Sequence, residues 1–175
     1  METWLLILII ALSVLLCLTL CCVLPCVCYS SSNNKWREAT VAKYVAVSEV
    51  AQTARGPVEY SKKGQAPYIL CVHGAPGSHD GVSGTFDIWA EQGFGIVCPS
   101  RPGYGRTPVE NGKTFADAAD TLVALMDTLN INEFAVLAIS AGGPTGYQIA
   151  HRHQDRVKCL VTEVAITGSF NHPYT

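Results

Sequence analysis

One serine in this 175-residue chain stands where a catalytic nucleophile would be expected. Ser140 follows an apolar run at 134–139, lies in the pentapeptide Ala-Ile-Ser-Ala-Gly, and is followed directly by a helical pattern. A sharp strand-to-helix turn exposes a serine hydroxyl above a sheet, and it needs small residues two positions away on each side, here Ala138 and Gly142. A serine that only caps a helix fits the same pattern, so this motif alone leaves both interpretations open.

Two further motifs precede Ser140, and each comes directly after a strand-like apolar run. The sequence His-Gly-Ala-Pro-Gly at 73–77 follows the run at 68–72. The sequence Ser-Arg-Pro-Gly-Tyr-Gly-Arg-Thr at 100–107 follows the run at 94–98. Together the three motifs favour a nucleophile at Ser140 over a helix cap.

These three ordered motifs resemble the α/β-hydrolase superfamily, nearest the branch that includes proline iminopeptidases and epoxide-hydrolase-like enzymes. The resemblance runs from about Thr53 to the last residue. It implies that Ser140 is the nucleophile and that the backbone N–H groups of Ala75 and Ala141 form the oxyanion hole. It also implies an ester or amide carbonyl as the electrophile and a small-molecule acyl substrate. Epoxide hydrolysis and dehalogenation are disfavoured, because in this superfamily they use a carboxylate nucleophile.

Three residues near these motifs are expected to shape loops. His73 and Gly74 belong to the implied oxyanion loop, where a structural hydrogen bond from the imidazole is the preferred interpretation. Arg101 is expected to brace the loops through backbone carbonyls, with direct substrate contact as the alternative.

The resemblance implies a catalytic acid and a histidine downstream of Ser140, in that order. The residues available there are His151, His153, Asp155 and His172. The first two are two positions apart on an expected helix and point to different faces, Asp155 falls in an expected exposed turn, and His172 lies beyond the last strand. None is expected to complete a triad, so the chain is interpreted as an incomplete domain with activity near background.

The rest of the C-terminal sequence predicts an α/β fold. Short β-branched runs alternate with helical patterns, which indicates a partial α/β-hydrolase domain with a doubly wound, mostly parallel sheet. Thr114 is expected to cap a helix with Asp117 at its third position. Strands are expected at 57–61, 68–72, 94–98, 134–139 and 159–166, and helices at 86–92, 114–129 and 143–153.

The N-terminus predicts a membrane anchor. Residues 4–24 are almost wholly apolar and are closed by Pro25, and about 20 such residues at about 1.5 Å each cover a hydrocarbon core of about 30 Å. The N-terminal Met-Glu-Thr lacks the basic start of a cleaved signal peptide, so an uncleaved anchor is favoured. The expected organisation is an anchor at 1–28, a linker and juxtamembrane segment at 29–52 and the hydrolase domain at 53–175. Residues 30–34 are expected to be flexible and residues 36–50 amphipathic.

The charges beside the anchor favour a single-pass protein with its domain in the cytosol. Lys35 and Arg37 follow the apolar run, and no Lys or Arg precedes it. The chain also contains no N-x-[ST] sequon. Net charge is −2 and the 12 Lys and Arg are scattered, which excludes nucleic acid as a partner.

Five of the eight cysteines crowd the first 28 residues. Their spacing lacks the C-x2-C and histidine partners of zinc sites, so no metal is expected, and no cofactor motif is present. They do not form the pattern of a disulfide framework either. Plain thiols in or beside a bilayer are one interpretation, and S-palmitoylation of Cys22, Cys26 or Cys28 is the other.

Three functional hypotheses follow from the sequence. The leading one is a membrane-anchored serine hydrolase of an ester, thioester, amide or related acyl bond. The second is a non-catalytic, membrane-tethered interaction protein that retains half a hydrolase fold. The third is an unstable by-product without function.

Overall fold

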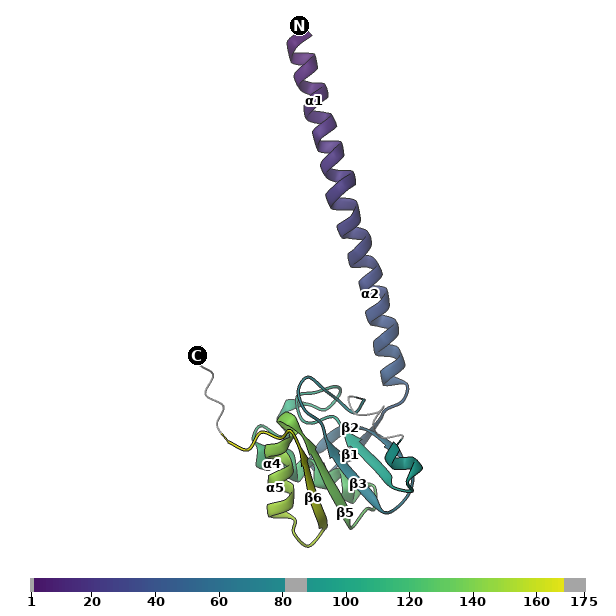
Figure 1. The fold of residues 1–175 in the computed structure, drawn as a ribbon, viewed down its shortest axis with the longest axis vertical. Coiled ribbons are helices and arrows are strands. Elements are labelled where there is room, and N and C mark those ends of the chain that lie inside the picture. Colours follow the sequence, from purple (N-terminus) through teal and green to yellow (C-terminus); the bar gives the residue numbers. More distant parts are fainter. Residues whose placement is uncertain (1, 81–87, 169–175) are drawn as a thin grey trace. The chain divides into compact units, whose positions relative to one another are not determined.

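The computed structural model describes residues 2–80 and 88–168, and its chain divides into two compact units, Met1–Ala46 and Val47–Thr175 (Figure 1). The first unit is a helix. It comprises α1 (Glu2–Leu18), a π-helical segment (Thr19–Val23) and α2 (Leu24–Val45), which follow one another without a break. By length and composition it is able to cross a membrane.

The helix continues through two places where the sequence predicted its end. Pro25 has no N–H to donate and its ring crowds the preceding turn, but the π-helical segment just before it widens that turn, with the Leu24 N–H bonded to the Thr19 carbonyl. The expected flexible linker at 30–34 is also helical. Ser and Asn cost at most about 0.7 kcal/mol each relative to Ala, and no Gly or Pro interrupts residues 26–45, so the helix persists.

The second unit is built on a six-stranded sheet with the order β1-β2-β4-β3-β5-β6. Strand β3 pairs in parallel with β4 and with β5, and β5 pairs in parallel with β6. Strand β2 pairs antiparallel with both β1 and β4. The sheet is therefore mixed, with parallel strands at its centre. The bounds are β1 (Glu49–Thr53), β2 (Gly56–Lys63), β3 (Tyr68–Val72), β4 (Gly95–Pro99), β5 (Phe134–Ile139) and β6 (Val157–Glu163).

The sheet begins before residue 53, where the sequence placed its start. Strand β1 was not predicted as a strand, and residues 36–50 are not one amphipathic element, because α2 ends at Val45 and β1 starts at Glu49. A tight turn explains the extra strand. Thr53 pairs with Gly56, whose φ of 102° suits glycine and reverses the chain into a hairpin.

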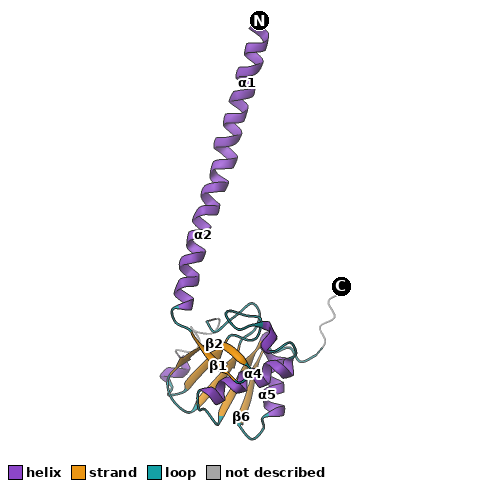
Figure 2. Cartoon of the chain, turned by 180° about the vertical axis from the view of Figure 1, so that it is seen from behind, coloured by secondary structure: helices purple, strands orange, loops and turns teal. Residues whose placement is uncertain are grey.

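Helices α4 (Phe115–Thr128) and α5 (Gly143–Arg152) cover one face of the sheet. They contact each other, α4 also contacts β1 and β2, and α5 contacts β5 and β6 (Figure 2). The predicted cap is confirmed, since the Thr114 hydroxyl accepts the Asp117 N–H at 3.1 Å. Residues 88–91 are also helical, and the remainder of the helix expected at 86–92 is partly outside the described residues.

The period of two along the strands divides the core between the two faces of the sheet. Under α4 and α5 lies the larger cluster, which includes Leu70, Val72, Val97, Val136 and Ala138 with Leu122, Leu125 and Met126 of α4. Cys71, Ile96 and Cys98 form a smaller cluster on the other face. Two helices thus cover one face of the sheet, and the other face carries a small cluster of buried apolar side chains.

Candidate active site at the end of strand β5

Ser140 lies in a strained turn between β5 and α5. Its φ is 50°, in the left-handed region, and it opens a short 3-10 segment (Ser140–Gly142) that leads directly into the helix. Such a conformation costs a non-glycine residue of the order of 1 kcal/mol, so it persists only where packing imposes it. The side chain is half-buried. The Ser140 carbonyl accepts the Ile166 N–H at 3.1 Å, which ties the chain after β6 to the turn.

The residues around this turn are small because the backbone leaves no room for larger ones. A Cβ on Gly142 would lie 2.3 Å from the Val72 carbonyl oxygen, and one on Gly74 would lie 2.9 Å from the Ser140 Cβ. Ala138 abuts Gly146 of α5, where a Cβ would lie 2.4 Å from the alanine methyl group. Alanine therefore meets the steric limit two positions before the serine.

The parallel register brings the two loops of the implied oxyanion hole together. Strands β3 and β5 pair with Val72 opposite Ala138, so the loops that follow them leave the same edge of the sheet. Gly74 consequently touches Ser140, and Ala75 is the next residue. Ala75 is an exposed residue, and within the described part of the chain no backbone hydrogen bond from its N–H is found.

His73 is buried and is held at both ring nitrogens. Its Nδ1 lies 2.7 Å from the Gly74 carbonyl oxygen, and its Nε2 accepts the Arg101 N–H at 2.9 Å. Because Nε2 accepts, the neutral ring carries its proton on Nδ1 and donates it to Gly74. Burial lowers the pKa of His73 to about 4, despite the Gly74 hydrogen bond that favours the protonated form. The ring is a neutral brace between two loops at ordinary pH.

Arg101 connects the loop after β4 with the turn at Ser140. Its Nη1 donates to the Ala141 carbonyl at 3.1 Å, and its guanidinium lies 4.9 Å from the centre of the Tyr104 ring. The same ring meets His73 edge-on, with centroids 4.9 Å apart. Nε and Nη2 of Arg101 are buried and have no hydrogen-bond partner among the described residues. Arg101 thus links the loop after β4 to the backbone that follows Ser140.

The downstream histidines lie at the far end of α5 from Ser140. A ten-residue helix is about 15 Å long, and His151 and His153 are at its C-terminal end. His153 Nε2 is 3.0 Å from Asp120 Oδ1 of α4, and Arg152 also bonds Asp120. Asp155 is exposed in the turn after the helix. His172 lies outside the described residues.

A buried carboxylate was missed in the sequence. Glu59 of β2 is 2% exposed and accepts hydrogen bonds from the hydroxyls of Ser48 and Ser100, both at 2.9 Å, and from Arg106 through N at 2.8 Å and Nε at 2.7 Å. His79 Nε2 is 3.7 Å from Oε1. Burial by itself raises the pKa of Glu59, but the hydrogen bonds outweigh it and the pKa is lowered.

Glu59 joins the β1–β2 hairpin to the loop at 100–107 and to the loop after β3. The available signal was a glycine in the second motif. A Cβ on Gly105, whose φ is 54°, would lie 2.0 Å from Glu59 Oε2, so the loop can close over the carboxylate only with glycine there. Among the described residues, no group of three or more His, Cys, Asp or Glu side chains could hold a metal ion.

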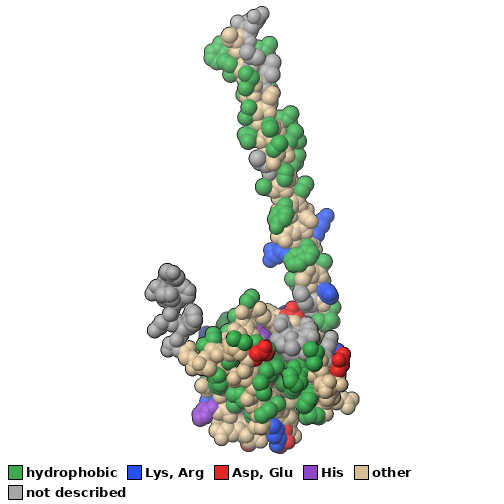
Figure 3. All heavy atoms as spheres, in the orientation of Figure 1, with side chains coloured by type: hydrophobic (Ala, Val, Ile, Leu, Met, Phe, Trp, Pro, Cys, Tyr) green, Lys and Arg blue, Asp and Glu red, His purple; other side chains and the backbone are tan. Residues whose placement is uncertain are grey.

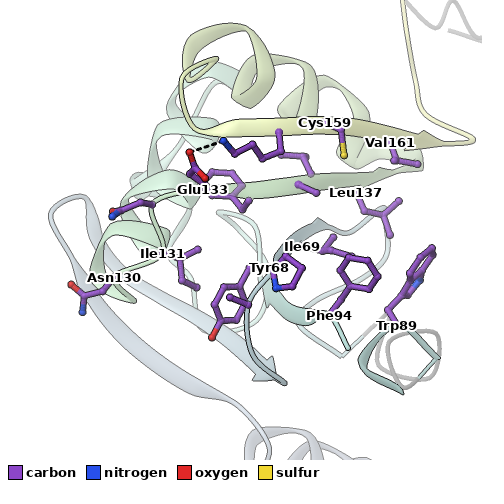
Figure 4. Close-up of a pocket in the computed structure, with 17 residues that line it drawn as sticks. Tyr68, Ile69, Trp89, Phe94, Asn130, Ile131, Glu133, Leu137, Cys159 and Val161 are labelled. Carbon is purple, nitrogen blue, oxygen red and sulfur yellow. Dashed lines mark hydrogen bonds and ion pairs between the residues drawn. The ribbon is translucent and has the colours of Figure 1, made fainter. Parts of the chain in front are cut away.

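A cavity of about 1040 Å³ lies away from this turn, on the face of the sheet opposite α4 and α5 (Figure 4). Ile69, Leu137, Cys159 and Val161 supply strand side chains to it, and Trp89 and Phe94 border it. Neither Ser140 nor the loops at 73–77 and 100–107 line it. It marks the thinly covered face of β5 and β6, and β6 is an edge strand whose residues are mostly exposed.

The α/β hydrolase fold family model matches residues 67–174, more than half of the chain. The chain belongs to the α/β-hydrolase fold family. This family member is 42% identical over 120 residues to an uncharacterized hydrolase of Bacillus subtilis (strain 168), covering 67% of this chain and 41% of the relative. The superfamily resemblance carried by the three motifs is thereby confirmed.

Solved structures agree with this assignment. An α/β hydrolase fold protein from Nakamurella multipartita matches with a TM-score of 0.68 and 36% identity, covering 71% of this chain and 43% of that one. An epoxide hydrolase mutant from Vigna radiata shares the fold, with a TM-score of 0.60 and 24% identity over 66% of this chain and 37% of its own. The chain thus spans about two fifths of the length of the curated relative and of these structures.

Proposed function

We propose that this protein is a membrane-anchored serine hydrolase that cleaves an ester, thioester, amide or related acyl bond of a small molecule, with Ser140 as nucleophile. The observation that carries the proposal is the left-handed turn at Ser140, which packs closely against Gly74 and against the Val72 carbonyl at the end of β5. Strain of this kind on a serine is maintained by its surroundings and is typical of a catalytic position.

In the proposed reaction, Ser140 Oγ adds to the acyl carbonyl carbon and the carbonyl oxygen becomes negatively charged. The N–H groups of Ala75 and Ala141 would donate to that oxygen, and each such donor contributes about 10²–10³ in rate. His73, Gly74 and Arg101 would hold these two loops in place. The tetrahedral intermediate would then collapse as the bond from the acyl carbon to the alcohol, thiol or amine breaks, and this leaving group would depart with the proton taken from Oγ. Water would then add to the acyl-serine and release the acid, which returns the proton to Oγ.

A base must take the proton from Oγ, and the described residues bring no His or Asp beside Ser140. His151 and His153 lie about 12–15 Å along α5 from its start. We assign the base and its acid partner to a part of the protein outside this chain, in keeping with the two fifths of the relatives' length that the chain spans. Without them the serine keeps the weak nucleophilicity of an alcohol.

The anchor is the helix of the first unit. Its apolar half satisfies every backbone group internally, as a segment in lipid must. In Figure 3 hydrophobic side chains cover the end near α1, and Lys and Arg side chains gather on the α2 half. Lys35, Arg37 and Lys43 follow the apolar run, which favours a cytosolic C-terminal domain.

A fluorophosphonate probe tests the nucleophile in a longer form of the protein that carries the downstream residues. Labelling is expected in the parent and in Ser78→Ala, a matched change of a serine in the neighbouring loop, and it should be lost in Ser140→Ala. A label that survives Ser140→Ala would refute the assignment. The present chain alone should hydrolyse a p-nitrophenyl ester near background.

The uncovered face of β5 and β6 favours one second function, a non-catalytic membrane-tethered interaction protein. Its cavity is apolar and its edge strand is open, as a surface for a protein partner would be. The probe separates the two hypotheses, because an interaction protein would leave Ser140 unlabelled in the longer form as well.

A further inference from the structure

The helix of the first unit carries exposed thiols at the point where its apolar stretch ends. Cys26 and Cys28 are free and exposed, and they lie two and four positions after Leu24. At about 1.5 Å per residue, they lie about 3 and 6 Å beyond Leu24 along the helix axis. Cys17 and Cys21 are exposed as well, but they lie about 10 and 4–5 Å before Leu24, among apolar residues.

Because α2 continues as a helix, the position of each thiol relative to the charged residues is defined. Lys35 and Arg37 follow Cys28 by two to three turns, about 10–14 Å along the axis. In a spanning helix these cations lie in the aqueous and headgroup layers, so Cys26 and Cys28 fall at the boundary with the hydrocarbon. Cys17 and Cys21 have sulfur atoms 3.9 Å apart on one side of the helix, and both residues fall inside the hydrocarbon layer.

We propose that Cys26 and Cys28 are S-acylated with long-chain saturated fatty acids, an inference that rests on the proposed membrane anchor. The thiolate attacks the carbonyl carbon of a long-chain acyl-coenzyme A. The new C–S bond joins the acyl group to the cysteine, the C–S bond to coenzyme A breaks, and coenzyme A leaves as its thiol with the proton from the cysteine. No net oxidation or reduction occurs.

The two sites differ in direction, which gives the modification a structural role. Residues two apart on an α-helix are about 200° apart around its axis. The acyl chains on Cys26 and Cys28 therefore enter the bilayer on opposite sides of the helix and restrain its tilt and depth. Pro25, next to Cys26, follows the widened turn of the π-helical segment.

The test uses the full chain expressed in mammalian cells fed with an alkynyl palmitate analogue, followed by neutral hydroxylamine, which cleaves thioesters. The parent should carry a hydroxylamine-sensitive label. The double variant Cys26→Ser/Cys28→Ser should lose nearly all of it, and the matched control Cys17→Ser/Cys21→Ser should keep it. Label that persists in the first double variant, or that disappears in Cys22→Ser alone, would overturn the assignment.

Alkaline carbonate washing of the same membranes separates the failure of the modification from the failure of the anchor. A parent chain in the pellet without label contradicts the acylation and leaves the anchor standing. A parent chain in the supernatant contradicts the anchor and the acylation together. A labelled parent in the pellet, with the loss confined to the Cys26 and Cys28 variants, supports both.

Discussion

At the scale of single residues, the turn at Ser140 depends on neighbours that have small side chains or none. Gly74 and Gly142 stand where any side chain would strike backbone or the serine itself, and Ala138 is packed against Gly146. The left-handed conformation of Ser140 is therefore the product of several close contacts, and one added methyl group should disturb it.

Gly142→Ala should lower the free energy of unfolding by about 1–3 kcal/mol or more, because its Cβ would meet the Val72 carbonyl, which belongs to a central strand and cannot yield cheaply. Pulse proteolysis in urea on the detergent-solubilised chain measures the change. The control is Gly168→Ala, since a Cβ at Gly168 meets nothing within 4 Å. Equal urea midpoints for Gly142→Ala and the parent would contradict the packing described at this turn.

His73 should make the stability of the second unit depend on pH. Its pKa is lowered to about 4 in the folded state from 6.5, first by burial, so between these values the unfolded chain binds more protons. The contribution of His73 to the free energy of unfolding is therefore fully present above pH 6.5 and is lost as the pH falls toward 4. One pKa unit corresponds to about 1.4 kcal/mol, so the decline should reach roughly 2–3 kcal/mol.

The comparison of unfolding free energies at pH 7 and pH 4.5 tests this, with His73→Gln as the matched variant. The variant should start less stable at pH 7 and show a smaller decline than the parent. Identical declines in parent and variant would show that other groups cause the pH dependence.

At the scale of elements, the β1–β2 hairpin is attached to the loops of the candidate site through one buried carboxylate. Glu59 receives bonds from Ser48 before β1 and from Ser100 and Arg106 after β4. Since the loop at 100–107 also carries Arg101, which bonds Ala141, the hairpin supports the turn at Ser140 from a distance.

Glu59→Gln should loosen the loop at 100–107. The amide group can accept fewer of these bonds, and leaving buried donors without partners costs about 1–3 kcal/mol. Hydrogen exchange should become faster at the Ser100 and Arg106 N–H groups, which bond the Glu59 carbonyl and carboxylate. Glu163→Gln, on the exposed edge strand β6, is the control and should leave these amides unchanged. Unaltered hydrogen exchange in Glu59→Gln would show that the β1–β2 hairpin does not hold the loop at 100–107 through this carboxylate.

At the scale of the whole molecule, an apolar helix and a hydrolase-fold unit occupy one chain. We expect the protein to stay in the pellet after alkaline carbonate washing, because the apolar run is long enough to span and carbonate releases only peripheral proteins. Release into the supernatant would contradict the anchor.

Sidedness needs a separate measurement, for which an engineered glycosylation site is suited. Asn132→Thr creates an acceptor sequon at Asn130, which is exposed. Asn111 is less suitable, since its side-chain amide donates to the Pro57 carbonyl at 2.7 Å. A cytosolic domain should leave Asn130→Gln/Asn132→Thr and Asn132→Thr with the same mobility on gels. A shift in Asn132→Thr alone, reversed by glycosidase, would place the domain in the lumen.

The sequence by itself determined the elements that depend on local pattern. The strands at Tyr68–Val72 and Phe134–Ile139, the cap at Thr114 and the turn at Ser140 follow from hydrophobic period, capping chemistry and small residues at fixed offsets, which act within a few positions of the chain. The three motifs indicated the family for the same reason, because each is short and contiguous.

Only the tertiary structure decided which distant groups meet. The pairing of β1, the enclosure of Glu59 and the engagement of His153 by Asp120 join residues 3 to 47 positions apart, and such contacts leave no periodic trace in the sequence. The continuation of the helix through Pro25 is also visible only in the structure. The widened turn before Pro25 removes the clash between the proline ring and the preceding turn. A local preference is overridden where tertiary packing stabilises another conformation by more free energy than the preference contributes. It is also overridden where one altered turn removes the clash on which the preference rests.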